Sequence, residues 1–128
     1  MNTLRKQLGE SLSLTRTAEG GGFSASLVLP DSFVGFQGHF PGSPVVPGVC
    51  LIQAVLVAAE RVLGKPLRLD EVKVAKFFSP LLAGQAAEIA GSVVASGANV
   101  EVAATFTSAG RKVAHVSLRA TVASPGGG

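Results

Sequence analysis

The clearest chemical features of this sequence are a histidine and a glycine in one Gly- and Pro-rich stretch, GFQGHFPGSPVVPG. His39 lies among apolar side chains. Five of the seven phenylalanines lie in or near this stretch or in a later predicted strand: Phe33, Phe36, Phe40, Phe77 and Phe78. Such surroundings disfavour the charged imidazolium, and a neutral imidazole can act as a general base.

Gly48 follows Pro47 where a helix is predicted to start. Backbone amides in the first turn of a helix have no partner inside it, and the helix dipole makes this end positive. A thioester carbonyl docked there would be polarised as negative charge develops on its oxygen. His39 and Gly48 together therefore predict proton abstraction beside a polarised carbonyl. Without the surrounding motif, a lone histidine in such a loop is more often a turn residue bonded to the backbone.

Periodic apolar positions predict the elements that hold these residues. Residues 48–63 carry apolar side chains at three- and four-residue spacing and are followed by Gly64 and Pro66, which predicts a helix of about four turns. Because Gln53 is the single polar residue of 49–59, we expect protein to surround this helix. Alternating segments predict six strands, of which the first two form a hairpin: 11–17, 23–29, 70–78, 86–95, 100–108 and 112–122.

These elements predict an α+β fold in which an antiparallel sheet of about six strands encloses one long helix. We expect residues 1–122 to form a single domain and residues 123–128, which end in three glycines, to form a disordered tail. With 47% apolar and 15% charged residues, the chain is not intrinsically disordered. So apolar a composition in a small domain also suggests self-association.

Composition narrows the classes of partner and compartment. A net charge of +3 and the absence of Trp and Tyr argue against nucleic acid as a partner. Cys50 is the only cysteine, which excludes an intramolecular disulfide and a multi-cysteine metal site. The apolar segment 49–59 is too short to span a membrane, and the N-terminal residues lack the apolar run of a signal peptide. We therefore expect a cytoplasmic protein without a membrane segment.

Two segments resemble a known family. GHFPGSPVVPG followed by LIQA is similar to the signature of the hotdog-fold 3-hydroxyacyl-(acyl carrier protein) dehydratases, of the FabZ and FabA type, and the match covers residues 36–58. VAKFFSPLLAG is a weaker echo of the family's strand after the helix. Glycines, prolines and a histidine at fixed offsets are far more specific than a single glycine motif. The resemblance implies a hotdog fold and the elimination of water from a 3-hydroxyacyl thioester, which gives a trans-2-enoyl thioester.

The resemblance also implies roles for individual residues. His39 matches the family's catalytic histidine, which removes the proton at C2, and Gly48 matches the glycine whose amide faces the thioester carbonyl. Gln53 stands where the family has Glu or Asp, so it can orient a hydroxyl or a water but cannot donate a proton as an acid. Taken alone, Gln53 could as well be a buried amide that anchors a loop. The expected substrate contacts are Phe36, Phe40, Pro47, Val49, Phe77 and Phe78.

Other positions are expected to serve structure. Ala83 and Gln85 depart from the family's usual Pro and Asp around a glycine, which affects the geometry of that turn alone. Cys50 is expected to be a packing residue beside the pocket. His115 has no acid or nucleophile close in sequence, and we expect it to be structural.

The resemblance implies partners but no metal and no cofactor other than the phosphopantetheine that carries the substrate. It implies a homodimer or a dimer-based oligomer in which two subunits build each tunnel, and an acyl carrier protein or coenzyme A as the carrier. Basic residues in 61–76 would meet an acidic carrier, although such a run is usually a solvated face. They are Arg61, Lys65, Arg68, Lys73 and Lys76.

Two further functions remain open at this point. One is a thioesterase on the same fold, in which Gln53 or His39 orients a water toward the carbonyl. The other is an acyl-binding paralogue that kept the tunnel without catalysis. The sequence leaves the acyl chain length and the pathway, whether fatty acid, polyketide or pigment, undetermined.

Overall fold

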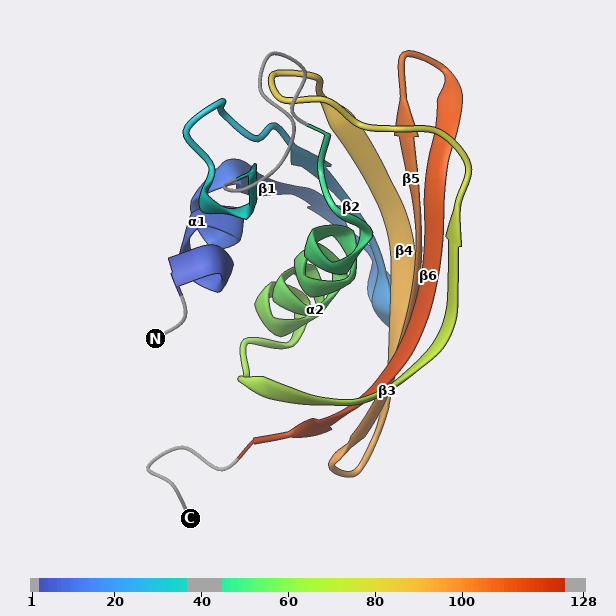
Figure 1. Ribbon diagram of the computed structural model, residues 1–128. Helices are drawn as coiled ribbons and strands as arrows, with labels where there is room; N and C mark the ends of the chain where they lie inside the picture. The colour runs from blue at the N-terminus through green and yellow to red at the C-terminus, as the bar shows by residue number, and fades with distance from the viewer. Residues whose placement is uncertain (1–2, 37–44, 124–128) are drawn as a thin grey trace.

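The computed structural model describes residues 3–36 and 45–123. Two α-helices and six strands occur in this part of the chain (Figure 1). In chain order they are α1 (Thr3–Ser11), β1 (Leu12–Thr17), β2 (Gly22–Leu27), α2 (Gly48–Leu63), β3 (Leu67–Phe77), β4 (Ala87–Ser96), β5 (Asn99–Ser108) and β6 (Arg111–Val122). Neither described helix is long and apolar enough to cross a membrane. Residues 124–128 of the expected tail lie outside the described residues.

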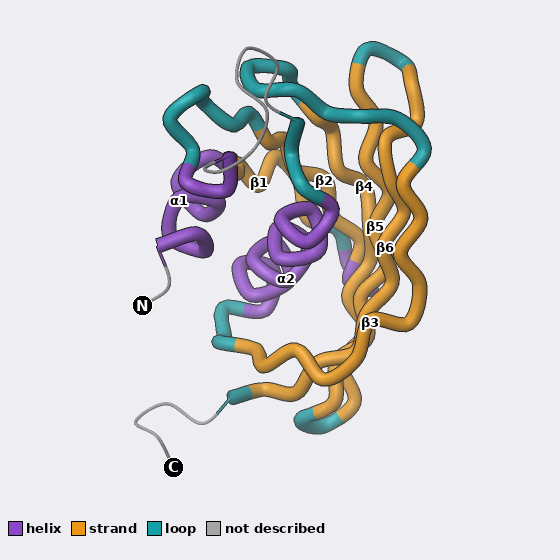
Figure 2. Tube along the Cα trace, viewed as in Figure 1, coloured by secondary structure: helices purple, strands orange, loops and turns teal. Residues whose placement is uncertain are grey.

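The six strands form one sheet in the order β1-β2-β4-β5-β6-β3, and every neighbouring pair is antiparallel. The sheet curves around α2, which lies against its concave face (Figures 1 and 2). This arrangement confirms the predicted α+β hotdog fold and the six predicted strands. The order also makes β1 and β3 the two edges of the sheet.

Helix α2 begins and ends where its flanking residues require. Pro47 has the extended backbone of an N-cap residue, with φ −62° and ψ 145°, and Gly64 ends the helix in the left-handed region at φ +69°. The Gly64 amide donates to the Glu60 carbonyl oxygen at 2.7 Å. The predicted bounds of this helix are therefore confirmed.

The hydrophobic core lies between α2 and the concave face of the sheet. The helix contributes a run of side chains that are at most 7% exposed: Cys50, Leu51, Ala54, Val55, Leu56, Val57, Ala58 and Ala59. Alternate residues of the central strands face them: Val100, Val102, Ala104 and Phe106 on β5, and Ala114, Val116, Leu118 and Ala120 on β6. Burial of this apolar area is what holds the helix in the sheet.

Helix α1 was not predicted, and it packs beside α2 (Figure 2). Its residue Leu8 is fully buried, whereas the other side chains of the helix are partly or fully exposed. Arg5 forms an ion pair with Glu60 of α2, and the guanidinium of Arg61 donates to the carbonyl oxygens of Gly9 and Leu12. These contacts fasten the last turn of α2 to the N-terminal helix.

Strand β3 is an exposed edge. It starts at Leu67, three residues before the predicted start at 70, and within the described residues it pairs with β6 alone. Apolar side chains lie along it without cover: Val72 is 38% exposed, Val74 37% and Phe77 51%. An edge strand of this kind offers unpaired backbone groups and apolar surface to another chain.

The hairpin between β5 and β6 is tightly fixed. Ala109 and Gly110 both have positive φ, of 52° and 74°, as a two-residue type I′ turn requires. The buried hydroxyl of Ser108 donates to the carbonyl oxygen of Ala86 at 2.7 Å. The turn and this hydrogen bond together set the position at which β6 begins.

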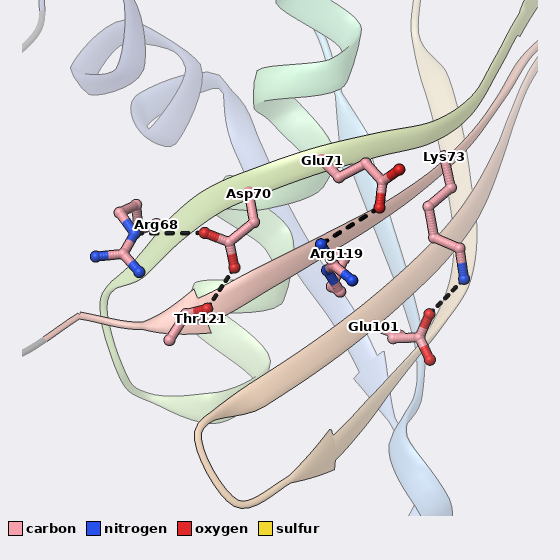
Figure 3. A network of polar contacts seen from close by, with 7 residues as sticks. All are labelled: Arg68, Asp70, Glu71, Lys73, Glu101, Arg119 and Thr121. Carbon is pink, nitrogen blue, oxygen red and sulfur yellow. Dashed lines mark hydrogen bonds and ion pairs between the residues drawn. The ribbon is translucent and has the colours of Figure 1, made fainter.

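Charged side chains cross the outer face of the sheet from β3 over β6 to β5 (Figure 3). Arg68 pairs with Asp70 at 3.4 Å, Arg119 with Glu71 at 3.4 Å, and Lys73 with Glu101 at 2.6 Å. The Thr121 hydroxyl also donates to Asp70. This hydrogen bond and, after it, Arg68 lower the pKa of Asp70, and Lys73 lowers the pKa of Glu101.

We predict that Thr121→Val raises the pKa of Asp70 toward its ordinary value of 3.8, because the variant loses the first cause of its lowering. The folded-state pKa of Asp70 lies below its unfolded value. The hydrogen bond therefore stabilises the folded protein at pH values above the unfolded-state pKa. This stabilisation is lost as the pH falls through the folded-state pKa. Titration of the carboxyl carbons by NMR measures the shift. Glu101 serves as the internal control, and an Asp70 pKa that does not move would contradict the assignment.

Candidate active site

A cavity of about 460 Å³ opens beside the first turn of α2. It is lined by Val45, Val46, Gly48, Leu51, Phe77, Phe78, Ser79, Pro80 and Leu81. Backbone contacts join residues 45–46 to residues 81–82. The Val46 amide donates to the Leu81 carbonyl oxygen at 2.8 Å, and Val45 forms a β-bridge with Leu82. The cavity therefore lies where the sequence analysis expects the polarising end of the helix.

Gly48 lets an aromatic ring approach the helix backbone. A Cβ atom at position 48 would lie 2.7 Å from Cζ of Phe77, closer than real Cβ atoms come to another heavy atom. Within the described residues, the amides of Gly48 and Val49 donate no hydrogen bond, whereas those of Cys50 and Leu51 donate to the Pro47 carbonyl oxygen. The first turn thus offers N–H groups that donate to no described residue, and the positive end of the helix dipole, beside an apolar cavity.

The structure brings some predicted substrate contacts together and separates others. Phe77 and Phe78 line the cavity with Gly48. Pro47 is the N-cap of α2, and Val49 is 61% exposed and does not line the cavity. His39 and Phe40 lie outside the described residues.

Phe36 is placed in the core instead of the cavity. Its side chain is only 8% exposed, and its ring packs edge-on against that of Phe33 with 5.3 Å between the ring centroids. It does not line the cavity beside Gly48. The spacing of phenylalanines predicts an apolar environment here, but it does not separate residues that line a cavity from residues that pack beneath it.

Gln53 does not face this cavity within one chain. It follows Leu51, which lines the cavity, by two positions, and two residues turn the helix by about 200°. The Gln53 side chain is half-buried, and among the described residues its carboxamide has no hydrogen-bond partner. The Gln53 carboxamide therefore points away from the side of α2 on which Leu51 lines the cavity.

Cys50 has the packing role expected of it. Its side chain is 1% exposed, and a Cβ atom at Gly35 would lie 2.9 Å from its Sγ atom. Burial raises the pKa of the Cys50 thiol, which keeps it in the weakly nucleophilic protonated form. In residues 3–36 and 45–123, no group of three His, Cys, Asp or Glu residues is placed to hold a metal ion.

The turn that departs from the family pattern is well formed. Gly84 has a φ of +80°, and its amide donates to the Leu29 carbonyl oxygen at 2.8 Å. The Gln85 side-chain oxygen accepts a hydrogen bond from the Leu82 amide at 2.9 Å. Gln85 therefore provides the acceptor that closes this turn. His115 also has a structural partner, since its Nδ1 lies 2.9 Å from the Thr105 hydroxyl oxygen.

The five predicted carrier-binding cations do not share one environment. Arg68 and Lys73 are bound to carboxylates on the outer face of the sheet (Figure 3), and Arg61 donates to backbone carbonyls. Lys65 and Lys76 are exposed and form no ion pair within the described residues.

A larger cavity, of about 860 Å³, lies at the opposite end of α2 from Gly48. Lys65 and Arg61 line it together with Arg5, Lys6 and the carboxylate of Glu60. Because Arg5, Arg61 and Glu60 hold α1, α2 and β3 together, we assign this region to the stability of the fold.

We predict that Gly48→Ala destabilises the protein by about 1 kcal/mol, because the added methyl group forces the Phe77 ring out of its position. Urea denaturation measures the loss of unfolding free energy. In a Phe77→Ala background, Gly48→Ala should cost much less, because the ring that the methyl group meets is absent. Gly22→Ala is the matched control, since its Cβ atom would lie an ordinary 3.7 Å from its nearest neighbour. Equal losses in the two single variants would contradict the close packing of Phe77.

Comparison with known protein families gives a match over most of the chain. The profile described as ApeI-like, ApeI dehydratase, matches residues 15–117. The 3-hydroxyacyl-(acyl-carrier-protein) dehydratase FabZ of Levilactobacillus brevis is 31% identical over 113 residues, which cover 83% of this chain and 69% of that protein. FabZ of Lactiplantibacillus plantarum is 40% identical over 76 residues, 54% of this chain, and the match spans less than half, 44%, of the length of that enzyme.

Solved structures share the fold at low sequence identity. The dehydratase heterocomplex ApeI:P from Xenorhabdus doucetiae has a TM-score of 0.68 and 18% identity, covering 84% of this chain and 96% of that one. A hypothetical thioesterase from Streptococcus pneumoniae with coenzyme A also has a TM-score of 0.68, with 15% identity and coverage of 89% and 87%. Since the family profile covers most of the sequence and the fold agrees, the chain belongs to the ApeI-like family of hotdog-fold dehydratases.

Proposed function

We propose that this protein eliminates water from a 3-hydroxyacyl thioester to give a trans-2-enoyl thioester. The observation that carries the proposal is the apolar cavity lined by Gly48, at the end of the motif that contains His39 and beside a first helical turn whose Gly48 and Val49 amides donate to no described residue. Membership of a dehydratase family supports the reaction class. The FabZ relatives support an acyl carrier protein as the carrier and fatty acid biosynthesis as the setting.

In the proposed reaction, the thioester carbonyl oxygen accepts hydrogen bonds from the backbone amides in the first turn of α2. His39 removes the proton at C2, and the negative charge that develops on the carbonyl oxygen is stabilised by these amides and the helix dipole. The bond between C3 and the hydroxyl oxygen then breaks as the double bond forms. The hydroxyl group takes the proton back from the His39 imidazolium and leaves as water, so that protons and electrons balance.

Gln53 has a positioning role in this scheme. A carboxamide donates and accepts hydrogen bonds but has no ionisable proton, which is why His39 must carry the proton in both directions. Because Gln53 faces away from the cavity in its own chain, we propose that the partner subunit's Gln53 meets the leaving hydroxyl. This arrangement requires two copies of the chain for each site.

We further propose a homodimer that forms through β3. The strand is an edge with exposed apolar residues, among them Val72 and Val74, and it runs from α2 toward the cavity at Phe77. Pairing two β3 strands would satisfy their free backbone groups and cover this surface. The reaction itself needs neither metal nor redox cofactor, and the single buried thiol Cys50 fits a reducing compartment such as the cytoplasm.

A thioesterase is the second candidate. The structural likeness to a hypothetical thioesterase with coenzyme A favours it, and so does a carboxamide in place of an acid. In that reaction Gln53 or His39 would orient a water that attacks the carbonyl carbon, and the thiol of the carrier would leave. The two reactions differ in a measurable product, because only the thioesterase releases free thiol.

We predict that the protein hydrates enoyl thioesters and dehydrates 3-hydroxyacyl thioesters reversibly without releasing thiol. His39→Ala should lower the rate by at least about a hundredfold, because it removes the base. Gln53→Glu should raise it, because a carboxylic acid adds a proton donor. The enoyl absorbance and a thiol reagent measure the two products, and His115→Ala is the control outside the site.

Full activity in His39→Ala would remove the mechanism, thiol release would indicate a thioesterase, and binding without turnover would indicate an acyl-binding paralogue.

We predict that Val74→Lys converts the dimer to monomer, because a charge on the edge strand opposes pairing with a second edge. Analytical ultracentrifugation measures the mass. Val94→Lys is the matched control, since Val94 is 59% exposed on β4, an inner strand of the sheet. A Val74→Lys variant that stays dimeric would rule out this interface. A monomeric wild-type protein would instead favour a different partner chain, as in the ApeI:P heterocomplex.

A further inference from the structure

Two cations stand at the rim of the cavity beside Gly48. The Lys112 Nζ atom lies 5.1 Å from the centroid of the Phe78 ring, within cation–π range. The guanidinium of Arg111 donates to the Pro80 carbonyl oxygen at 3.2 Å. Both Phe78 and Pro80 line the cavity, so the positive charges contact its wall directly.

The backbone beneath these cations is held in place. The Phe78 amide donates to the Val113 carbonyl oxygen at 2.8 Å, and the Ser79 hydroxyl donates to the Lys112 carbonyl oxygen at 2.6 Å. The preceding turn is fixed by the buried Ser108, whose hydroxyl is bound to Ala86. Arg111 and Lys112 therefore extend from an ordered hairpin that is joined to the wall of the cavity.

No carboxylate among residues 3–36 and 45–123 forms an ion pair with either cation of this rim. The four ion pairs among the described residues use Arg5, Arg68, Lys73 and Arg119. Arg111 and Lys112 take part in none of them. A positive rim on an apolar cavity fits a ligand with an apolar body and an anionic end, because the charged end keeps a partner while the body leaves water.

We propose that Lys112 and Arg111 bind the phosphate group of the phosphopantetheine arm that carries the acyl thioester. The inference rests on the proposed function, which places the thioester carbonyl at the start of α2. Phe77 and Phe78 line the same cavity as Gly48, so the arm would run along these two rings toward Lys112 and Arg111. Arginine and lysine both bind phosphate, the former through its planar fork and the latter as a compact charge. The assignment differs from the cations of 61–76 predicted from sequence, of which Arg68 and Lys73 are already paired.

Calorimetric binding of two ligands to the full-length protein tests this assignment. Butyryl-phosphopantetheine carries the phosphate, butyryl-pantetheine lacks it, and neither can lose water because C3 bears no hydroxyl group. We expect Lys112→Met and Arg111→Gln each to weaken binding of the phosphorylated ligand about tenfold. Binding of the ligand without phosphate should change by less than about twofold, since it makes no charged contact.

Matched variants separate this rim from general charge effects. Lys6→Met on α1 and Arg16→Gln on β1 remove the same charges elsewhere and should leave both affinities unchanged. Raised salt should weaken binding of the phosphorylated ligand to the wild-type protein and should weaken it less in Lys112→Met. Butyryl-coenzyme A and a butyryl carrier protein, which carry the same phosphate, should follow the phosphorylated ligand.

Three results would overturn the phosphate site. They are unchanged affinity in both rim variants, equal losses for both ligands, or a loss confined to butyryl-coenzyme A, which would assign the cations to the nucleotide. The binding measurement needs no turnover. A protein that shows the expected binding pattern but fails to dehydrate its substrate therefore retains the phosphate site and contradicts the proposed reaction alone.

Discussion

Burial of α2 is the constraint on which the rest of this molecule depends. A helix with so few polar positions is stable in water only when protein covers it, and the curved sheet covers one side while α1 covers part of another. Its two ends are treated differently. The last turn is held by Glu60 and Arg61, which bind α1 and the start of β3. At the first turn, the amides of Gly48 and Val49 donate to no described residue, and Gly48 lies against the ring of Phe77.

Sequence periodicity predicted α2 and all six strands because each is defined by which of its residues face the core. It did not predict α1, because the sequence TLRKQLGES has only two large apolar residues, Leu4 and Leu8, too few to establish a helical pattern. The stability of α1 comes from tertiary contacts such as the ion pair between Arg5 and Glu60, which are 55 positions apart. The helix that the sequence did not predict is therefore the one whose stabilising partners are remote in sequence.

The same distinction applies to the site. Gly48 and Phe77 were predicted from local motifs, and the structure brings them into contact at one cavity. Phe36 was predicted to contact substrate but packs against Phe33, because an aromatic side chain gains as much from the core as from a cavity wall. Lys73 belongs to a basic run, yet its charge is taken up by Glu101 on β5, a pairing that only the register of the sheet determines.

The two edges of the sheet are unequal. Strand β1 has six residues, and a shift in register between Leu14 and Arg16 interrupts its pairing with β2. Strand β3 has eleven residues and presents apolar side chains to solvent. Growth of a filament by strand addition requires two edge strands that can both pair. A single such edge is fully paired once two copies meet about a twofold axis. When β3 pairs as proposed above, the sheet closes as a pair of copies instead of extending into a filament, and the shorter strand β1 stays outside the interface.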